Sequence, residues 1–200
     1  MERKPSQVRT VLMRKLLIAL LLLSPACVRA QAPPDTPLQH AVEHALIGQW
    51  TGVLEYRDYR EPAESTKRVE LPTWLAIGTQ PEGLRLIYTY DDGPAKVLRE
   101  ESTLVLNTTT AAYKVVAADG PGEKYSIAGL EKLHDGYGTL VLTGRGTENK
   151  SAVDVRITLV LRRNLLSWLK ETRPSGSAGA FSFRDRYLFT RAEVPAATKP

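Results

Sequence analysis

The chain has 200 residues, enough for one domain with a sizeable core. Its 27 Lys and Arg residues outnumber its 22 Asp and Glu residues, but six of the basic residues and one acidic residue lie within residues 1–30. The rest of the chain therefore carries equal numbers of positive and negative charges. This balance argues against nucleic acid or an anionic membrane surface as a partner, because affinity for phosphate depends largely on excess Lys and Arg.

The first 30 residues are typical of a signal peptide. Basic residues precede an apolar run at residues 16–23, which is far shorter than the ~20 residues that a membrane-spanning helix needs. Small side chains at Val28 and Ala30 predict cleavage after Ala30, and hence a periplasmic or secreted protein. A second interpretation uses Cys27, because residues 23–27 resemble the segment before the lipidated cysteine of bacterial lipoproteins. Lipidation there would anchor the protein to a membrane.

Downstream of the leader, residues 31–35 predict a flexible lead-in and residues 192–200 a loose tail. Residues 36–191 are expected to form one domain. Because Cys27 is the only cysteine, this domain would hold no disulfide and would depend on burial of its core.

A short helix is predicted at the start of the domain. Thr36 is suited to the N-cap, Pro37 to the first helical position and Gln39 to the capping box. Gly48 is suited to end the helix. Apolar residues recur at three- and four-residue spacing, at Leu38, Val42, Ala45 and Leu46. We expect this helix to dock by that stripe on one end of the structure that follows.

From Trp50 onward the apolar residues alternate, which is the period of a β-strand. Strands are predicted in residues 50–57, 69–77, 84–90, 96–106, 113–115, 125–127, 140–142, 153–161, 165–171 and 181–189. Turn sequences rich in Gly, Pro, Asp and Asn separate them. This pattern predicts an all-β fold, an antiparallel up-and-down meander closed into a barrel of roughly eight to ten strands, with a two-sheet sandwich as the alternative. Pro72 lies inside a predicted strand, where a closed barrel has no edge, so we expect a β-bulge there.

Gly48-Gln49-Trp50, at the junction of the helix and the first strand, resembles the signature of the lipocalins and the wider calycin group. In those barrels the Trp closes one end and an Arg from the end of the last strand packs over it. The resemblance implies that Trp50 and Arg191 form the barrel floor here, because the end of an antiparallel last strand meets the start of the first. A guanidinium over an indole is also stabilised by cation–π attraction.

The mouth would then lie at the opposite end, ringed by loops at residues 58–66, 91–95, 118–123, 146–152 and 172–180. Tyrosines fall mainly on the apolar side of their strands, and Tyr combines apolar bulk with a hydroxyl that needs a partner. We expect them either to fill the core or to contact a small, hydrophobic or amphipathic ligand without catalysis. The candidate contact residues are Tyr56, Tyr88, Tyr90, Tyr113 and Tyr187, with Arg99 if its strand turns that face inward.

Two other functions remain open. A barrel filled by its own side chains would serve as a structural or interaction protein of the cell envelope. Gly48-x-Trp50-x-Gly52 also resembles the opening of nitrobindin-type haem barrels, which implies a haem held by a His late in the chain. No His follows His134 in this sequence.

The sequence presents no converging set of catalytic residues. Residues 40–44 match the H-x-x-E-H pattern of inverted zinc peptidases, but the strands that follow offer no second helix to supply another zinc ligand, so an exposed helix face is the favoured interpretation. Glu100 and Glu101 are adjacent and would point to opposite faces of a strand. We therefore expect neither a metal nor a cofactor.

Overall fold

The computed structural model describes residues 37–62, 65–116 and 122–192. The predicted signal peptide, Cys27, the lead-in and the tail beyond Ala192 lie outside the described residues, so the expectations about them remain predictions.

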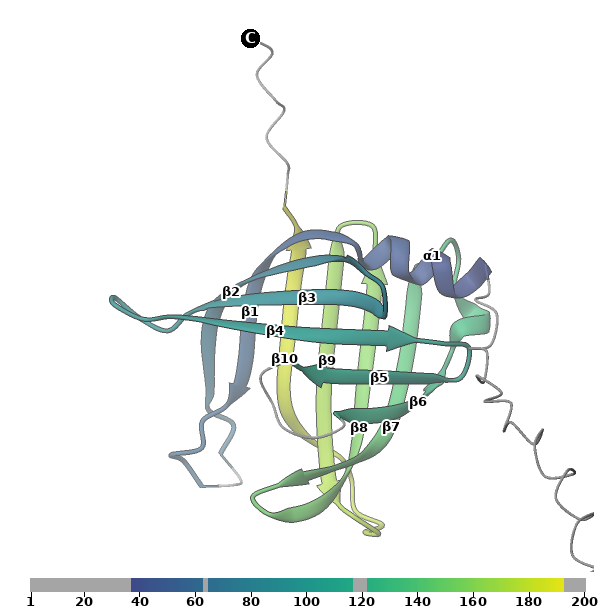
Figure 1. The fold of residues 1–200 in the computed structure, drawn as a ribbon. Coiled ribbons are helices and arrows are strands. Elements are labelled where there is room, and N and C mark those ends of the chain that lie inside the picture. Colours follow the sequence, from purple (N-terminus) through teal and green to yellow (C-terminus); the bar gives the residue numbers. More distant parts are fainter. Residues whose placement is uncertain (1–36, 63–64, 117–121, 193–200) are drawn as a thin grey trace, which may run out of the picture. The chain divides into compact units, whose positions relative to one another are not determined.

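Helix α1 (Pro37–Leu46) carries a fully buried apolar stripe of Val42, Ala45 and Leu46. It lies at the end of the barrel where the first strand begins (Figure 1). Gly136, in the connection between β6 and β7, packs so closely against it that a Cβ atom there would come within 2.2 Å of the Ala41 carbonyl oxygen. Neither α1 nor the one-turn helix η1 (Leu130–Lys132) is long and apolar enough to cross a membrane.

Ten antiparallel strands form one closed barrel in simple chain order. They are β1 (Gly48–Arg57), β2 (Arg68–Gln80), β3 (Gly83–Asp91), β4 (Val97–Leu106), β5 (Thr110–Val115), β6 (Glu123–Ala128), β7 (Gly138–Glu148), β8 (Ser151–Arg162), β9 (Leu165–Pro174) and β10 (Ser182–Arg191). Strand β1 pairs with both β2 and β10, which closes the sheet. The predicted up-and-down barrel is confirmed and the sandwich is excluded.

The core follows from the two-residue period of the strands. Ile157 and Leu159 of β8 are buried, whereas Thr158 between them faces outward and keeps solvent contact. The same alternation turns Leu84 and Leu86 of β3 inward. Toward α1, these side chains and their equivalents fill the interior of the barrel.

The bulge expected at Pro72 is absent. The pairing of β1 with β2 runs without a break through Val53 and Pro72. Strand β2 begins to pair with β3 only at Thr73, so Pro72 lies in a stretch with a neighbour on one side only, where a missing N–H is tolerated. The bulge that the structure does contain lies in β10, between Phe183 and Asp185.

The barrel wall is uneven at the end away from α1. Strands β5 and β6 pair with each other over only four residue pairs, whereas β7 and β8 pair over eleven. Strand β5 pairs only with residues 102–106 of β4, so residues 97–101 of β4 have no partner in β5. Figure 1 shows β5 and β6 as the shortest arrows of the sheet. The wall is therefore low on this side of the mouth.

Candidate ligand-binding site

The floor of the barrel is formed by Trp50 and Arg191. The Arg191 guanidinium lies 4.2 Å from the centroid of the Trp50 ring, the contact that the calycin resemblance implies. It also donates hydrogen bonds to the carbonyl oxygens of Ala45 at 2.7 Å, Ile47 at 2.8 Å and Arg163 at 3.0 Å. Trp50 Nε1 donates to the Leu46 carbonyl at 2.9 Å. The floor therefore ties α1 to the first and last strands.

The interior next to the floor is packed. Its cavity measures about 10 Å³, which is room for about one water molecule. The cavity is lined by apolar side chains of the floor end and by aromatic rings above them, including Leu46, Leu86, Leu166 and Phe189. No ligand of any size fits there without displacing these side chains.

A layer of five aromatic side chains lies across the middle of the lumen: Tyr88 and Tyr90 of β3, Tyr113 of β5, Trp168 of β9 and Tyr187 of β10. The ring centroids of Tyr88 and Tyr187 are 5.2 Å apart, and those of Tyr113 and Trp168 are 6.1 Å apart. The hydroxyls of Tyr90 and Tyr187 share a hydrogen bond of 2.9 Å. We call these five residues the aromatic layer, and the space between it and the mouth the upper lumen.

Polar groups on the inner face contact the aromatic layer. The Ser102 hydroxyl is 2.9 Å from the hydroxyl of Tyr113, and both lie 3.4 Å from a carboxylate oxygen of Glu100. Across the lumen, Lys170 Nζ donates to both carboxylate oxygens of Glu123 at 3.3 Å. Tyr125 donates to the same carboxylate.

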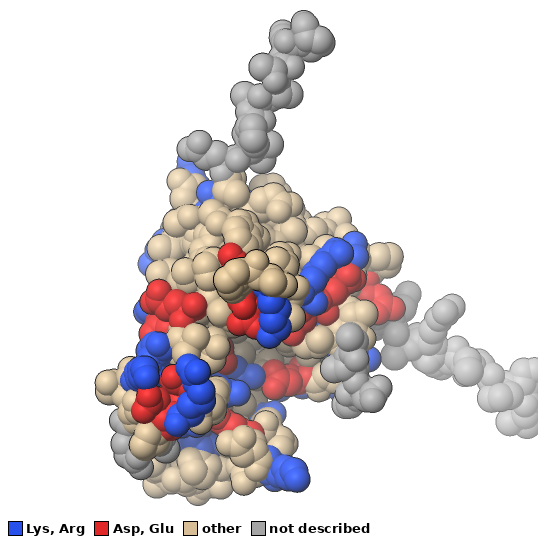
Figure 2. All heavy atoms as spheres, turned by 90° about the vertical axis from the view of Figure 1, so that its left-hand side faces the viewer, with Lys and Arg blue, Asp and Glu red and all other residues tan. Residues whose placement is uncertain are grey.

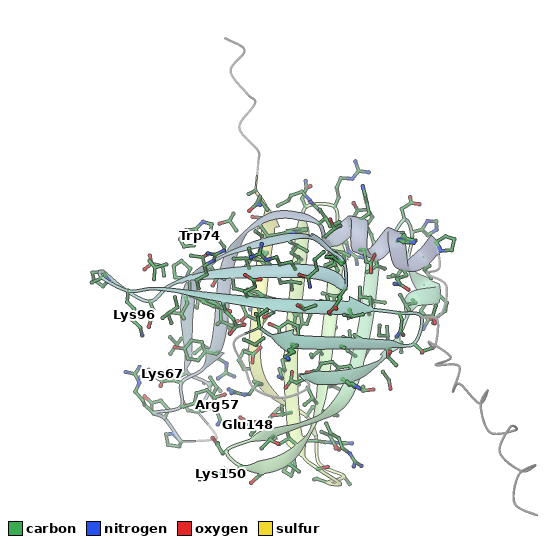
Figure 3. The ribbon with its side chains drawn as sticks, in the orientation of Figure 1. Arg57, Lys67, Trp74, Lys96, Glu148 and Lys150 are labelled. Carbon is green, nitrogen blue, oxygen red and sulfur yellow. The ribbon has the colours of Figure 1, made fainter. Side chains whose placement is uncertain are left out.

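A second ion pair lies nearer the mouth. Arg184 Nε is 3.2 Å from Glu148 Oε1, and the Thr172 hydroxyl donates to Glu148 Oε2 at 2.9 Å. The ring of Tyr59, from the loop between β1 and β2, lies 4.5 Å from the Arg184 guanidinium and 4.7 Å from that of Arg57. Arg57 and Glu148 are labelled at this end of the barrel in Figure 3.

The upper lumen is open to solvent. The inward-facing side chains of Glu123 and Lys170 are 37% and 24% exposed, whereas Tyr88, in the aromatic layer beneath them, is 3% exposed. Figure 2 shows acidic and basic side chains gathered around a hollow on the face that carries the β1–β2 and β3–β4 loops. Water therefore reaches the charged groups above the aromatic layer.

Asp185 is the titratable group of the upper lumen that stands out. It lies opposite Tyr56 of β1 and Lys170 of β9. Burial raises the pKa of its carboxyl to about 6, against the attraction of Lys170 and Arg184. Burial likewise raises the pKa of Tyr90 to about 12, and the charges of Glu100 and Asp185 add to the rise. A carboxyl group that titrates near neutral pH beside phenols can hold a charged ligand group or exchange a proton with it.

The structure brings most of the predicted contact residues together. Tyr88, Tyr90, Tyr113 and Tyr187 belong to the aromatic layer, and Tyr56 faces inward nearer the mouth, opposite Val69. These placements do not test ligand contact, which remains a prediction.

Arg99 is a correction to the predicted set. It pairs with the outward-facing Thr89 and is exposed on the outer wall. Its neighbour Glu101 forms a salt bridge with Arg85 on the same outer face, with a closest N···O distance of 2.6 Å. Because successive residues of a strand alternate between faces, the residue of β4 that faces the lumen is Glu100.

Sequence reasoning missed seven inward-facing charged or aromatic residues. They are Glu100, Glu123, Glu148, Trp168, Lys170, Arg184 and Asp185. For Asp185 a signal was present, because it shares the two-residue period of Tyr187 and Phe189.

The histidines do not support a haem or zinc site. His40, His44 and His134, the only His residues of the chain, are all described and all exposed, away from the lumen. His40 lies 3.8 Å from Glu43 on the exposed part of α1. The part of the chain that the structure describes contains no group of three or more His, Cys, Asp or Glu residues that could hold a metal ion. The lumen residues thus do not fit a haem held by a His ligand.

Comparisons with known proteins leave the family open. No family model matches the chain, and no curated protein matches it. Among solved structures, the chain is similar to Rv2717c from M. tuberculosis, with a TM-score of 0.49 and 15% sequence identity. That match covers 80% of this chain and 100% of the other.

Proposed function

We propose that this protein is exported and binds a small amphipathic molecule in its upper lumen without catalysis. The observation that carries the proposal is that charged side chains face inward above the aromatic layer and yet remain accessible to solvent. A barrel that served only as a solid scaffold would gain nothing from placing charges there, because desolvating them is unfavourable. The signal-peptide pattern of residues 1–30 supports export.

The amphipathic character of the ligand is inferred from the wall of the upper lumen. The cavity of about 10 Å³ near the floor excludes a fatty-acid-like molecule that would lie wholly within an apolar core. Beside the aromatic layer, Leu54 of β1 lies directly opposite Leu71 of β2, and both side chains are only half-buried. Leu98 of β4 also faces inward and is 44% exposed. A ligand with a polar end at the tyrosines and an apolar part on these leucines would match both surfaces.

Native mass spectrometry tests the proposal. The purified mature protein is incubated with a mixture of fatty acids, isoprenoids and charged or neutral amphiphiles, and we expect one amphiphile to be retained per chain. Leu54→Gln, in the lumen, should weaken retention, whereas Val53→Gln, on the adjacent outward-facing residue, should not. Retention of no compound would contradict the proposal.

A filled barrel with an envelope interaction role is the second candidate. The packed floor half favours it, and so do the exposed Trp74 and Leu188 on the outer wall. This function would be favoured if the protein retained no small molecule but remained folded.

Intact-mass analysis of the native protein identifies the first residue of the mature chain, because cleavage before Gln31 and lipidation at Cys27 give different masses.

A further inference from the structure

We infer that the ligand carries a positive charge, which Glu100 and Asp185 receive in the upper lumen. This inference depends on the proposed function and specifies the chemical class of the ligand, an organic ammonium ion with a short apolar tail. It is carried by how the charges of the lumen pair and by the tyrosines that lie between the two carboxylates, since the charges of both act on Tyr90.

The two inward-facing cations of the upper lumen already form ion pairs with carboxylates. Among the described residues, the inward-facing strand positions carry two basic side chains beside four carboxylates, and Arg57 lies at the mouth beside Arg184. Lys170 is paired with Glu123, and Arg184 is paired with Glu148. Within the same residues, Glu100 and Asp185 form no ion pair. These inward-facing positions therefore carry two carboxylates in excess, and an anionic ligand held among them would meet repulsion.

The two unpaired carboxylates are also short of hydrogen-bond donors. The contacts of Glu100 with the Ser102 and Tyr113 hydroxyls, at 3.4 Å, are near the outer limit for a hydrogen bond. Asp185 accepts no hydrogen bond from a described residue. Because a partly buried carboxylate without donors is unfavourable, both groups would gain from a ligand that brings N–H donors.

Both carboxylates lie around the same pair of phenols. Glu100 lies directly opposite Tyr88 in the β3–β4 pair, and Asp185 shares its face of β10 with Tyr187. The hydrogen bond between the Tyr90 and Tyr187 hydroxyls joins these two sides of the lumen. An ammonium group placed here would meet carboxylates, phenolic oxygens and ring faces, all of which attract a cation.

The apolar wall begins next to this position. Leu98 lies directly opposite Tyr90, and Leu54 lies directly opposite Tyr187. An ammonium group at the phenols thus leaves its tail along leucines that lead toward the mouth. Burial of that tail would strengthen binding in proportion to the apolar surface removed from water.

Three probes with the same tail separate charge from apolar contact. Octylammonium, octanol and octanoate are titrated into the protein by isothermal calorimetry at neutral pH. We expect octylammonium to bind at least tenfold more tightly than octanol, and octanoate to bind most weakly. Glu100→Gln and Asp185→Asn should each lower the affinity for octylammonium about tenfold and leave that for octanol unchanged. Glu101→Gln, the adjacent outward-facing residue, is the matched control and should change neither.

The outcomes distinguish this inference from the function on which it depends. If octanol or octanoate binds within twofold of octylammonium, the lumen binds amphiphiles but does not select a cation, and the inference is overturned. If Glu101→Gln weakens binding as much as Glu100→Gln, the effect comes from general surface charge and the inference is also overturned. If none of the three probes binds, the proposed function fails and the inference fails with it. Circular dichroism shows that each variant is folded.

Discussion

Replacement of Arg191 by Met is expected to destabilise the barrel by about 3 kcal/mol. Three hydrogen bonds from the guanidinium to carbonyl oxygens would be lost, each worth about 1 kcal/mol net. The contact with the Trp50 ring adds roughly 0.5–1 kcal/mol. Met retains most of the packing of the aliphatic stem, and water partly replaces the lost donor, so the expected loss lies somewhat below this sum.

Urea unfolding followed by tryptophan fluorescence measures this loss. A decrease of about 3 kcal/mol corresponds to a fall of about 1 M in the urea midpoint for a domain of this size. Arg191→Lys should lose most of the same stability, because one ammonium cannot bridge three carbonyls in the geometry of a guanidinium. The control is Arg186→Met on the outer face of the same strand, which removes an exposed ion pair with Glu55 and should change stability little. If the two Met variants unfold at the same urea concentration, the floor does not stabilise the fold as we argue.

Three further variants test the fold and the site. Gly136→Ala should lower the urea midpoint strongly because its Cβ would meet the Ala41 carbonyl, whereas Gly176→Ala, with a similar positive φ and nothing within 4 Å, reports backbone strain alone. Equal losses in the two variants would exclude a clash at α1. Ser102→Ala leaves the Tyr113 hydroxyl without its 2.9 Å partner and should cost about 1 kcal/mol in the same assay; an increase in stability would contradict this. Arg99→Gln should leave octylammonium binding unchanged because Arg99 lies on the outer wall, and a tenfold change would refute that placement.

The barrel was predictable because its signals are local. Alternation in segments such as residues 153–161, with turn sequences between them, predicts hairpins whatever the rest of the chain does. The contact of Trp50 with Arg191 followed from chain order once the barrel was assumed. Pro72 was misjudged because strand stagger, which leaves β2 without a neighbour on one side at that point, is a property of the assembled sheet.

The site was predictable only where its residues are apolar. Tyr88 and Tyr187 follow the period of buried leucines, so their inward direction could be inferred. Glu100 and Lys170 are charged, and the alternation rule alone would place a charged side chain on the outer face of its strand. Near the mouth the rule reverses, because the lumen there is open to water and the outer wall carries apolar residues such as the exposed Val97. The prediction for Arg99 depended on its strand turning the face of Arg99 and Glu101 inward, and the structure turns that face outward.

Asp185→Asn separates a structural role from a binding role, because the two predict opposite signs. The pKa of Asp185 is raised to about 6 in the folded protein, from an ordinary value of 3.8. The folded state therefore binds this proton more tightly than the unfolded state. The resulting stabilisation is complete below about pH 3.8 and is lost as the pH rises through about 6. At neutral pH the charged carboxylate destabilises the barrel, so Asn should raise the urea midpoint there and reduce its change between pH 5 and pH 7.5.

The same substitution should weaken octylammonium binding, and binding to the unaltered protein should strengthen as the pH rises through about 6. A side chain that lowers stability and supports binding is what a site selected for function would contain. A variant that is less stable at neutral pH, with an unchanged pH dependence, would instead show that Asp185 holds the barrel together. Asp185 would then contribute to folding and not to the attraction of a cation into the upper lumen.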